Sequence, residues 1–260
     1  MTQPIKHLVT ALDDPRISRS DFRHLPATDD DGRVTLVGVV HDHPASVFRV
    51  VETVAALDPD VVALEIAPIA VPLFRRYARE HGSDPELIAS AFHDGGEMSA
   101  AISAAGDARA VGIDLPNSSV LRTTIDSVRT ESLSVHGAVR AGYAFGIQTL
   151  HAVQCRISHA ASRIGIDVDP GLDARRDTYT RTASPDDQAV EEDDAVAAGT
   201  TLLRAFSRPP AMEAFDRARE AAMADELCTH RRDGADVVAV VGYAHLDPIA
   251  ERLGDDRSRS

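Results

Sequence analysis

Residues 34–66 read VTLVGVVHDHPASVFRVVETVAALDPDVVALEI, and this stretch decides the fold. Its two apolar runs, 34–40 and 61–66, show no alternation with polar residues, which predicts strands covered on both faces. The valines between the runs recur at helical spacing and predict a helix. That helix should end at Asp58, because the residue before a proline avoids the α region. Strand, helix and strand at this spacing predict a parallel βαβ unit with a right-handed crossover.

Two further apolar runs, ARAVGID at 108–114 and DVVAVVG at 236–242, predict a third and a fourth buried strand. The chain is therefore expected to belong to the α/β class, with a mostly parallel or mixed central sheet flanked by helices. Helical spacing and turn residues predict the remaining helices over residues 72–80, 85–92, 97–105, 118–131, 133–164, 196–206 and 211–231, with a last helix that ends by Leu253.

We expect one domain over residues 34–253, preceded by an N-terminal extension (1–33) and followed by a tail (254–260). The middle section, 132–210, is interpreted as a helical insertion or lid. Within it, residues 165–195 are dense in Asp and Arg and poor in apolar residues, which predicts an exposed segment.

The composition is that of a globular protein, with 43% hydrophobic residues but only 4% aromatics and no Trp, so the core must be mainly aliphatic. Lys6 is the one lysine among 27 basic residues, the formal charge is −14, and aspartates outnumber glutamates 29 to 12. An acid-rich, lysine-poor surface indicates a halophilic, archaeal cytoplasm, although a GC-rich genome also favours Arg, Ala and Asp. The negative charge argues against a nucleic-acid partner, since phosphate binding needs the opposite sign.

Cys155 and Cys228 are far apart and form no metal-binding or disulfide pattern, as expected of reduced thiols in a cytoplasm. The first residues lack the apolar run of a signal peptide, and no stretch of about 18 apolar residues predicts a membrane span. A cytoplasmic protein without a membrane partner is therefore expected.

An ionisable residue lies at the end of each predicted strand or within three residues after it. His41 follows the first strand, Glu65 lies at the end of the second, Asp114 ends the third, and His245 follows the fourth. Open α/β sheets bind their ligands at the carboxyl ends of parallel strands. The four side chains are therefore candidates for a common site.

Simpler explanations stay open for some of these residues. A single histidine after a strand is often only a loop residue, and Asp114 is suited to cap the following helix. His43, next to Pro44, is either a helix-start residue or a support for the site. Glu65 is harder to explain in this way, because a buried carboxylate without a partner costs several kcal/mol.

Two motifs add to the candidate site. G-V-V-H (38–41) and G-Y-A-H (242–245) share one form after similar strands, and their glycines would allow a sharp turn and close approach of a ligand. In G-G-E-M (95–98), two flexible glycines precede Glu97 at a helix start, a position from which a carboxylate can enter a cleft.

The chain resembles the TraB/PrgY family, the pheromone-shutdown-related proteins, which are related to TIKI metalloproteases and more distantly to erythromycin esterases. The matching motifs, in family order, are G-V-V-H-D-H (38–43), P-D-V-V-A-L-E (59–65), G-G-E-M-S-A-A-I (95–102), V-G-I-D (111–114) with L-R (121–122), R-E-A-A-M-A-D-E-L (219–227) and V-V-A-V-V-G-Y-A-H-L-D-P-I (237–249).

This resemblance implies the fold of those families, with a helical middle insertion, and a site of His41, Glu65, Glu97 and His245. It also implies supporting roles for Arg122 and Arg219. TIKI relatives imply a divalent-metal peptidase, esterase relatives imply a His/Glu hydrolase, and pheromone-shutdown proteins imply the inactivation or sequestration of a peptide.

Three functions follow from these residues. In the first, a metal-dependent hydrolase, His41, His245 and Glu65 hold Mn²⁺, Co²⁺ or Zn²⁺ and the mobile Glu97 is the general base. The second is a metal-free hydrolase in which His41 activates water and Glu65 orients its ring. The third is a protein that binds a small peptide or small molecule without turnover, and a homodimer is compatible with all three.

Overall fold

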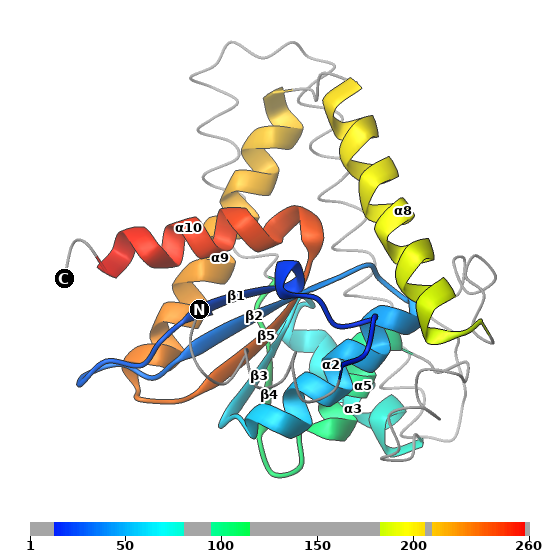
Figure 1. Cartoon of the computed structure of the whole chain (residues 1–260). Helices are drawn as coiled ribbons and strands as arrows, with labels where there is room; N and C mark the ends of the chain where they lie inside the picture. Colours follow the sequence, from blue (N-terminus) through cyan, green and yellow to red (C-terminus); the bar gives the residue numbers. More distant parts are fainter. Residues whose placement is uncertain (1–12, 81–94, 115–182, 206–209, 258–260) are drawn as a thin grey trace, which may run out of the picture.

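The alternation of strands and helices predicted from the sequence is present in the structure. The computed structural model of the chain describes residues 13–80, 95–114, 183–205 and 210–257. These residues form a sheet with helices on both faces (Figure 1), which confirms the predicted α/β class. None of the helices within these ranges is long and apolar enough to cross a membrane.

The sheet has five strands in the order β1-β2-β5-β3-β4. Strands β2, β5, β3 and β4 run parallel, and β1 pairs antiparallel with β2 at the edge. Strand β5, which comes last in the sequence, therefore lies between β2 and β3 and pairs with both. The strands are β1 (Phe22–Leu25), β2 (Val34–Val39), β3 (Val61–Leu64), β4 (Arg109–Gly112) and β5 (Val237–Gly242).

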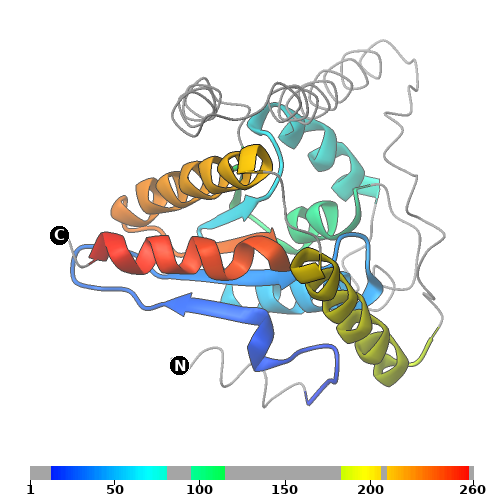
Figure 2. The same ribbon diagram turned by 90° about the horizontal axis from the view of Figure 1, so that it is seen from above.

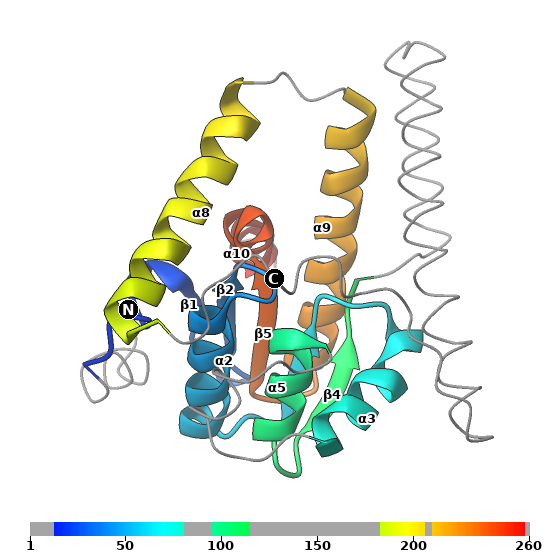
Figure 3. The same cartoon turned by 90° about the vertical axis from the view of Figure 1, so that its right-hand side faces the viewer.

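The helices cover the two faces of the sheet separately (Figure 2). One face packs against α2 (Pro44–Leu57), α3 (Val71–Glu80) and α5 (Gly96–Ala104). The other face packs against α9 (Pro210–Arg232) and α10 (Tyr243–Arg257). Helix α8 (Pro185–Ala205) contacts α2, and Figure 3 shows α8 and α9 rising beyond the sheet with α10 between them.

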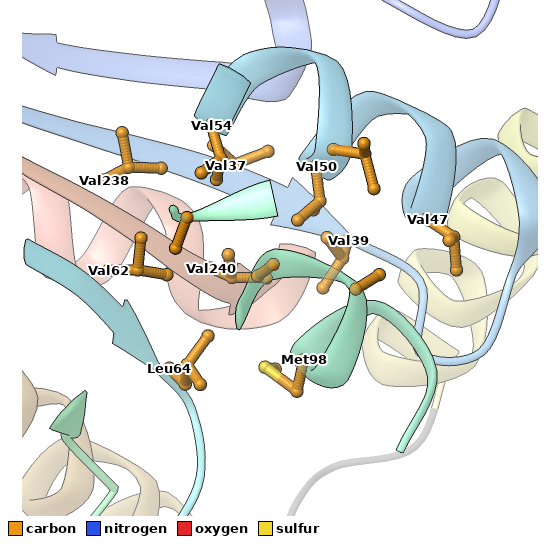
Figure 4. Packing of buried hydrophobic residues seen from close by; sticks show 14 of the residues in the cluster. Val37, Val39, Val47, Val50, Val54, Val62, Leu64, Met98, Val238 and Val240 are labelled. Carbon is orange, nitrogen blue, oxygen red and sulfur yellow. The ribbon is translucent and has the colours of Figure 1, made fainter. Parts of the chain in front are cut away.

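The absence of polar alternation in β5 follows from its position between two layers of helices. Val238 and Val240 belong to the core on the α2 side, whereas Val237, Ala239 and Val241 belong to the core on the α9 and α10 side. Successive side chains of a strand point to opposite faces, so a central strand with two covered faces needs apolar residues throughout. Figure 4 shows the first of these cores, built from valines of α2 and of the central strands together with Leu64 and Met98.

The strands at 34–40, 61–66, 108–114 and 236–242 are confirmed, each with slightly shorter bounds. Strand β1 was not predicted, since residues 1–33 were interpreted as an extension outside the domain. Its four residues include Arg23 and His24, and only Phe22 and Leu25 at its ends are buried. So short an edge strand has no periodicity to read and depends on its pairing with β2.

For the part of the segment 165–195 that the structure describes, the predicted exposure is confirmed for most residues, but the predicted helix start at residue 196 is wrong. Helix α8 begins at Pro185, where the Ser184 hydroxyl accepts a hydrogen bond from the backbone N–H of Asp187 at 3.2 Å. A serine cap, a proline in the first turn and early aspartates all favour a helix start. Two side chains of this acidic segment, Gln188 and Glu192, are buried.

The last helix continues to Arg257, so the predicted end at Leu253 and most of the predicted tail are wrong. The predicted helices 72–80, 97–105 and 211–231 agree with α3, α5 and α9 within one residue at either end. The predicted helices 85–92, 118–131 and 133–164 lie outside the described residues.

We predict that Gly38→Ala destabilises the protein by about 1–3 kcal/mol. Gly38 lies inside β2, where a Cβ would be 2.9 Å from the Tyr243 ring and 3.0 Å from the Leu246 side chain. Both are packed and would have to shift. Thermal and denaturant unfolding measure the change, and the control is Gly199→Ala on exposed α8, where no atom lies within 4 Å of the added Cβ. A stability of Gly38→Ala equal to that of Gly199→Ala would contradict this packing.

Candidate functional site

The carboxyl ends of the parallel strands bring the predicted site residues together. His41 follows β2, Glu65 follows β3, and Asp114 follows β4. His245 lies in the first turn of α10, which begins directly after β5. The Glu65 carboxylate lies between the two histidines and interacts with both.

Glu97 is joined to this group by the glycines that precede it. Gly95 and Gly96 have φ values of 85° and 47°, in the left-handed region that favours glycine, and a Cβ on Gly96 would collide with the Asp42 carboxylate. This turn starts α5 so that Glu97 points at the end of β2. Its Oε1 lies 2.6 Å from Nδ1 of His41, and its Oε2 accepts the backbone N–H of Asp42 at 2.9 Å.

The predicted mobility of Glu97 is therefore wrong. Its side chain is only 3% exposed and both carboxylate oxygens are engaged. The glycines provide an unusual backbone geometry and not freedom of movement. Glu97 fixes the orientation of His41, and the ring nitrogen left for chemistry is Nε2.

His41 is the most accessible member of the site, with 42% of its side chain exposed. Burial by the surrounding atoms acts to lower its pKa, but the hydrogen bond to Glu97 and the negative charges of Glu97, Glu65 and Asp42 outweigh it and raise the pKa to about 9. Its Nε2 lies beside the end of β5, where a Cβ on Gly242 would be 3.3 Å from Nε2 and 3.5 Å from Oε2 of Glu65.

Glu65 is buried at the centre of the site and has a partner for each oxygen. Oε2 accepts the backbone N–H of Gly242 at 2.7 Å, and Oε1 accepts Nη2 of Arg219 at 2.9 Å. Burial acts to raise its pKa, but the positive charges of His245, His41 and Arg219 and the Gly242 hydrogen bond together lower it. Glu65 is therefore a carboxylate, and it ties β3 to β5.

Arg219, on α9, is the cation at the back of the site. Its guanidinium forms a bidentate pair with Asp114, with distances of 3.0 and 2.8 Å, and also binds Glu65. Burial acts to lower the pKa of Arg219, but the bonds to Asp114 and the nearby carboxylates raise it, so the side chain stays charged. Asp114 is therefore a partner of Arg219 in the site, which the helix-cap explanation did not predict.

His245 is held from both sides by neighbouring residues of α9. Its Nδ1 lies 3.0 Å from Oε1 of Glu220, and its Nε2 lies 3.3 Å from Nη1 of Arg219 and 3.5 Å from Glu65. Burial acts to lower the pKa of His245, but the hydrogen bond to Glu220 and the charge of Glu65 raise it, against an opposing effect of Arg219. Sequence reasoning missed Glu220 as a site residue, although its place next to Arg219 was a usable signal.

Two other residues predicted for the site, His43 and Arg122, are not among the contacts described above. His43 is fully buried at the start of α2, where its Nδ1 accepts the backbone N–H of Ala45 at 3.2 Å. The helix-start explanation therefore holds for it. Arg122 lies outside the described residues.

The arrangement does not fit a metal ion shared by His41, Glu65 and His245. Among the described residues, no three His, Cys, Asp or Glu side chains are placed to hold a metal. Arg219 binds the Glu65 oxygen that faces His245 and also contacts the His245 ring, so a fixed positive charge already lies where a shared cation would bind. A metal site stays a prediction that would require Arg219 to move.

Comparisons with family models, curated proteins and solved structures found no match to this chain. The resemblance to the TraB/PrgY family therefore stays a prediction.

We predict that Arg219→Met destabilises the protein by about 3 kcal/mol, because Glu65 and Asp114 are left buried without their counter-charge. The double variant Arg219→Met with Glu65→Gln should recover part of this loss, since it removes one of the stranded charges. Denaturant unfolding of the two single variants and the double variant gives the coupling free energy. Strictly additive effects would show that the two side chains do not interact.

Proposed function

We propose that the protein is a hydrolase that cleaves an ester or amide bond with a water molecule activated by His41, without a metal ion. The observation that carries this proposal is the 2.6 Å contact of the buried Glu97 with Nδ1 of the exposed His41 ring. A carboxylate that holds one imidazole nitrogen directs the other nitrogen at a reacting group. This is the second of the three functions predicted from the sequence, except that Glu97 and not Glu65 orients the His41 ring.

In the proposed reaction, Nε2 of His41 removes a proton from water as the water oxygen attacks the carbonyl carbon. The proton then passes from His41 to the leaving oxygen or nitrogen as the scissile bond breaks, so that His41 returns to its starting state. The charges of Glu97 and Glu65 favour the imidazolium that forms in between. No covalent bond to the protein is required.

The charged cluster behind His41 supports this chemistry by holding the site in place. Arg219 and Gly242 bind Glu65, and Arg219 and Glu220 bind His245, so each side chain has fixed partners before a substrate arrives. Pre-organised charges of this kind need no reorganisation during the reaction.

The resemblance to the TraB/PrgY family supports a small peptide or another small molecule as the substrate. The many aspartates and the near-absence of lysine support a cytoplasm of high salt concentration as its location. Assays are therefore best made in molar salt.

We predict that kcat/KM rises with pH between about 6.5 and 9. The neutral form of His41 is the base, and a pKa raised to about 9 leaves most rings protonated at pH 7. In Glu97→Gln the carboxylate that raises the pKa is gone, so the midpoint should move to lower pH. The plateau should also fall about 100-fold, because the ring is no longer oriented.

The measurement is the pH profile of ester and short-peptide hydrolysis for the wild type, Glu97→Gln and His41→Ala. Glu251→Gln, an exposed carboxylate on α10, is the matched control and should behave as the wild type. Unchanged hydrolysis in His41→Ala, or binding of peptides without any turnover by the wild type, would contradict the proposal.

A further inference from the structure

Helix α8 is attached to the rest of the described structure in an unusual way. Among its side chains that the structure describes, only Gln188 and Glu192 are buried, and both are polar. They lie four residues apart and therefore on one face of the helix. Val190, by contrast, is 62% exposed. Burial of apolar side chains, which attaches most helices to a core, contributes little here.

The partners of these two residues are arginines of the N-terminal segment and of α2. Glu192 forms an ion pair with Arg49, and Nη1 of Arg16 lies 3.5 Å from the side-chain oxygen of Gln188. Arg49 is only 2% exposed, and it also binds Asp21 at 2.9 Å and the carbonyl oxygen of Gly38 at 2.8 Å. A buried guanidinium thus joins α8 to η1 (Arg19–Asp21) and to β2.

The same face of α8 reaches the turn that carries His41. The Ser46 hydroxyl accepts the backbone N–H of Val40 at 2.8 Å and donates to the carboxylate of Glu192. The adjacent Glu191 lies 3.7 Å from Nε2 of the buried His43. Residues 40–46 are therefore held by α8 at Ser46 and at His43, on both sides of Pro44.

We propose that Glu192 is a positioning residue for His41, and that α8 serves as a brace for the turn of residues 40–46. Glu97 fixes the His41 ring from α5, and Glu192 fixes the backbone that carries the ring from α8. The position of His41 thus depends on a helix that is held mainly by polar contacts. Displacement of α8 would move the proposed base, whereas the contacts of Arg219 with Glu65, Asp114 and His245 do not involve α8.

The structural part of this proposal is tested by hydrogen–deuterium exchange in molar salt. In Glu192→Gln, amides of residues 40–46 and of α8 should exchange about tenfold faster, because the ion pair that anchors the turn is lost. Amides of β5 should exchange as in the wild type. Asp193→Asn is the matched control, with the same charge change one residue further on an exposed side chain, and it should leave all of these rates unchanged.

Glu192→Asp is the second variant and covers the case in which Glu192→Gln does not fold. It keeps the charge for Arg49 but is one methylene shorter, so it cannot span Arg49 and Ser46 together, and exchange of residues 40–46 should still be faster. Wild-type exchange of residues 40–46 in Glu192→Asp would overturn the proposal. Equal acceleration in β5, or the same effect in Asp193→Asn, would overturn it as well.

The catalytic part rests on the proposed function. In Glu192→Asp, kcat should fall about tenfold while KM stays within about twofold, since the base is displaced and no proposed substrate contact is changed. An unchanged kcat together with faster exchange would overturn the positioning role. If the wild type hydrolyses no substrate, the proposed function fails, and the exchange rates still decide whether α8 braces the turn.

Discussion

The buried carboxylate of Glu65 is the group on which the arrangement of the site depends. It accepts the backbone N–H at the end of β5, binds Arg219 of α9, and lies between the two histidines. A carboxylate in such a place is unfavourable unless its charge and both oxygens are satisfied. The surrounding residues are therefore constrained: a positive group must face it from α9, and β5 must end beside it.

The position of Arg219 is the reason that we propose a hydrolase without a metal ion over one with a metal ion. Imidazole and carboxylate groups are suitable ligands for a divalent cation. In the present arrangement, however, Arg219 lies where an ion shared by Glu65 and His245 would bind. The Arg219 guanidinium is the counter-charge of Glu65 and Asp114 and also contacts His245. It binds both oxygens of the Asp114 carboxylate. His41 is paired with Glu97 through Nδ1, and 42% of its side chain is exposed. This geometry supports our proposal that His41 activates water.

The α/β class of the fold and many residues of the candidate site could be predicted from the sequence. Central strands covered on both faces need unbroken apolar runs, so β2, β3 and β5 were recognisable, and a parallel sheet places their carboxyl ends together. His41, Glu65, Asp114 and His245 were found in this way.

The remaining features depend on pairings between distant segments, which leave little local signal. The role of Glu97 follows from the left-handed backbone of two glycines, which in the sequence suggest only flexibility. Glu192 looks like one more acid in a charged segment, and its burial depends on Arg49, far away in the chain. Strand β1 likewise exists through its pairing with β2.

The most direct test of the account is the metal stoichiometry of the protein purified in molar salt without chelator, followed by equilibrium dialysis against Mn²⁺, Co²⁺ and Zn²⁺. Because Arg219 already lies among the residues that would bind a shared ion, we predict well below one ion per chain before and after dialysis. Arg219→Met, measured in the same way, shows whether the guanidinium is what keeps an ion out. One tightly bound ion per chain in the wild type, lost in His41→Ala and His245→Ala, would contradict the account and restore the metal-dependent hydrolase.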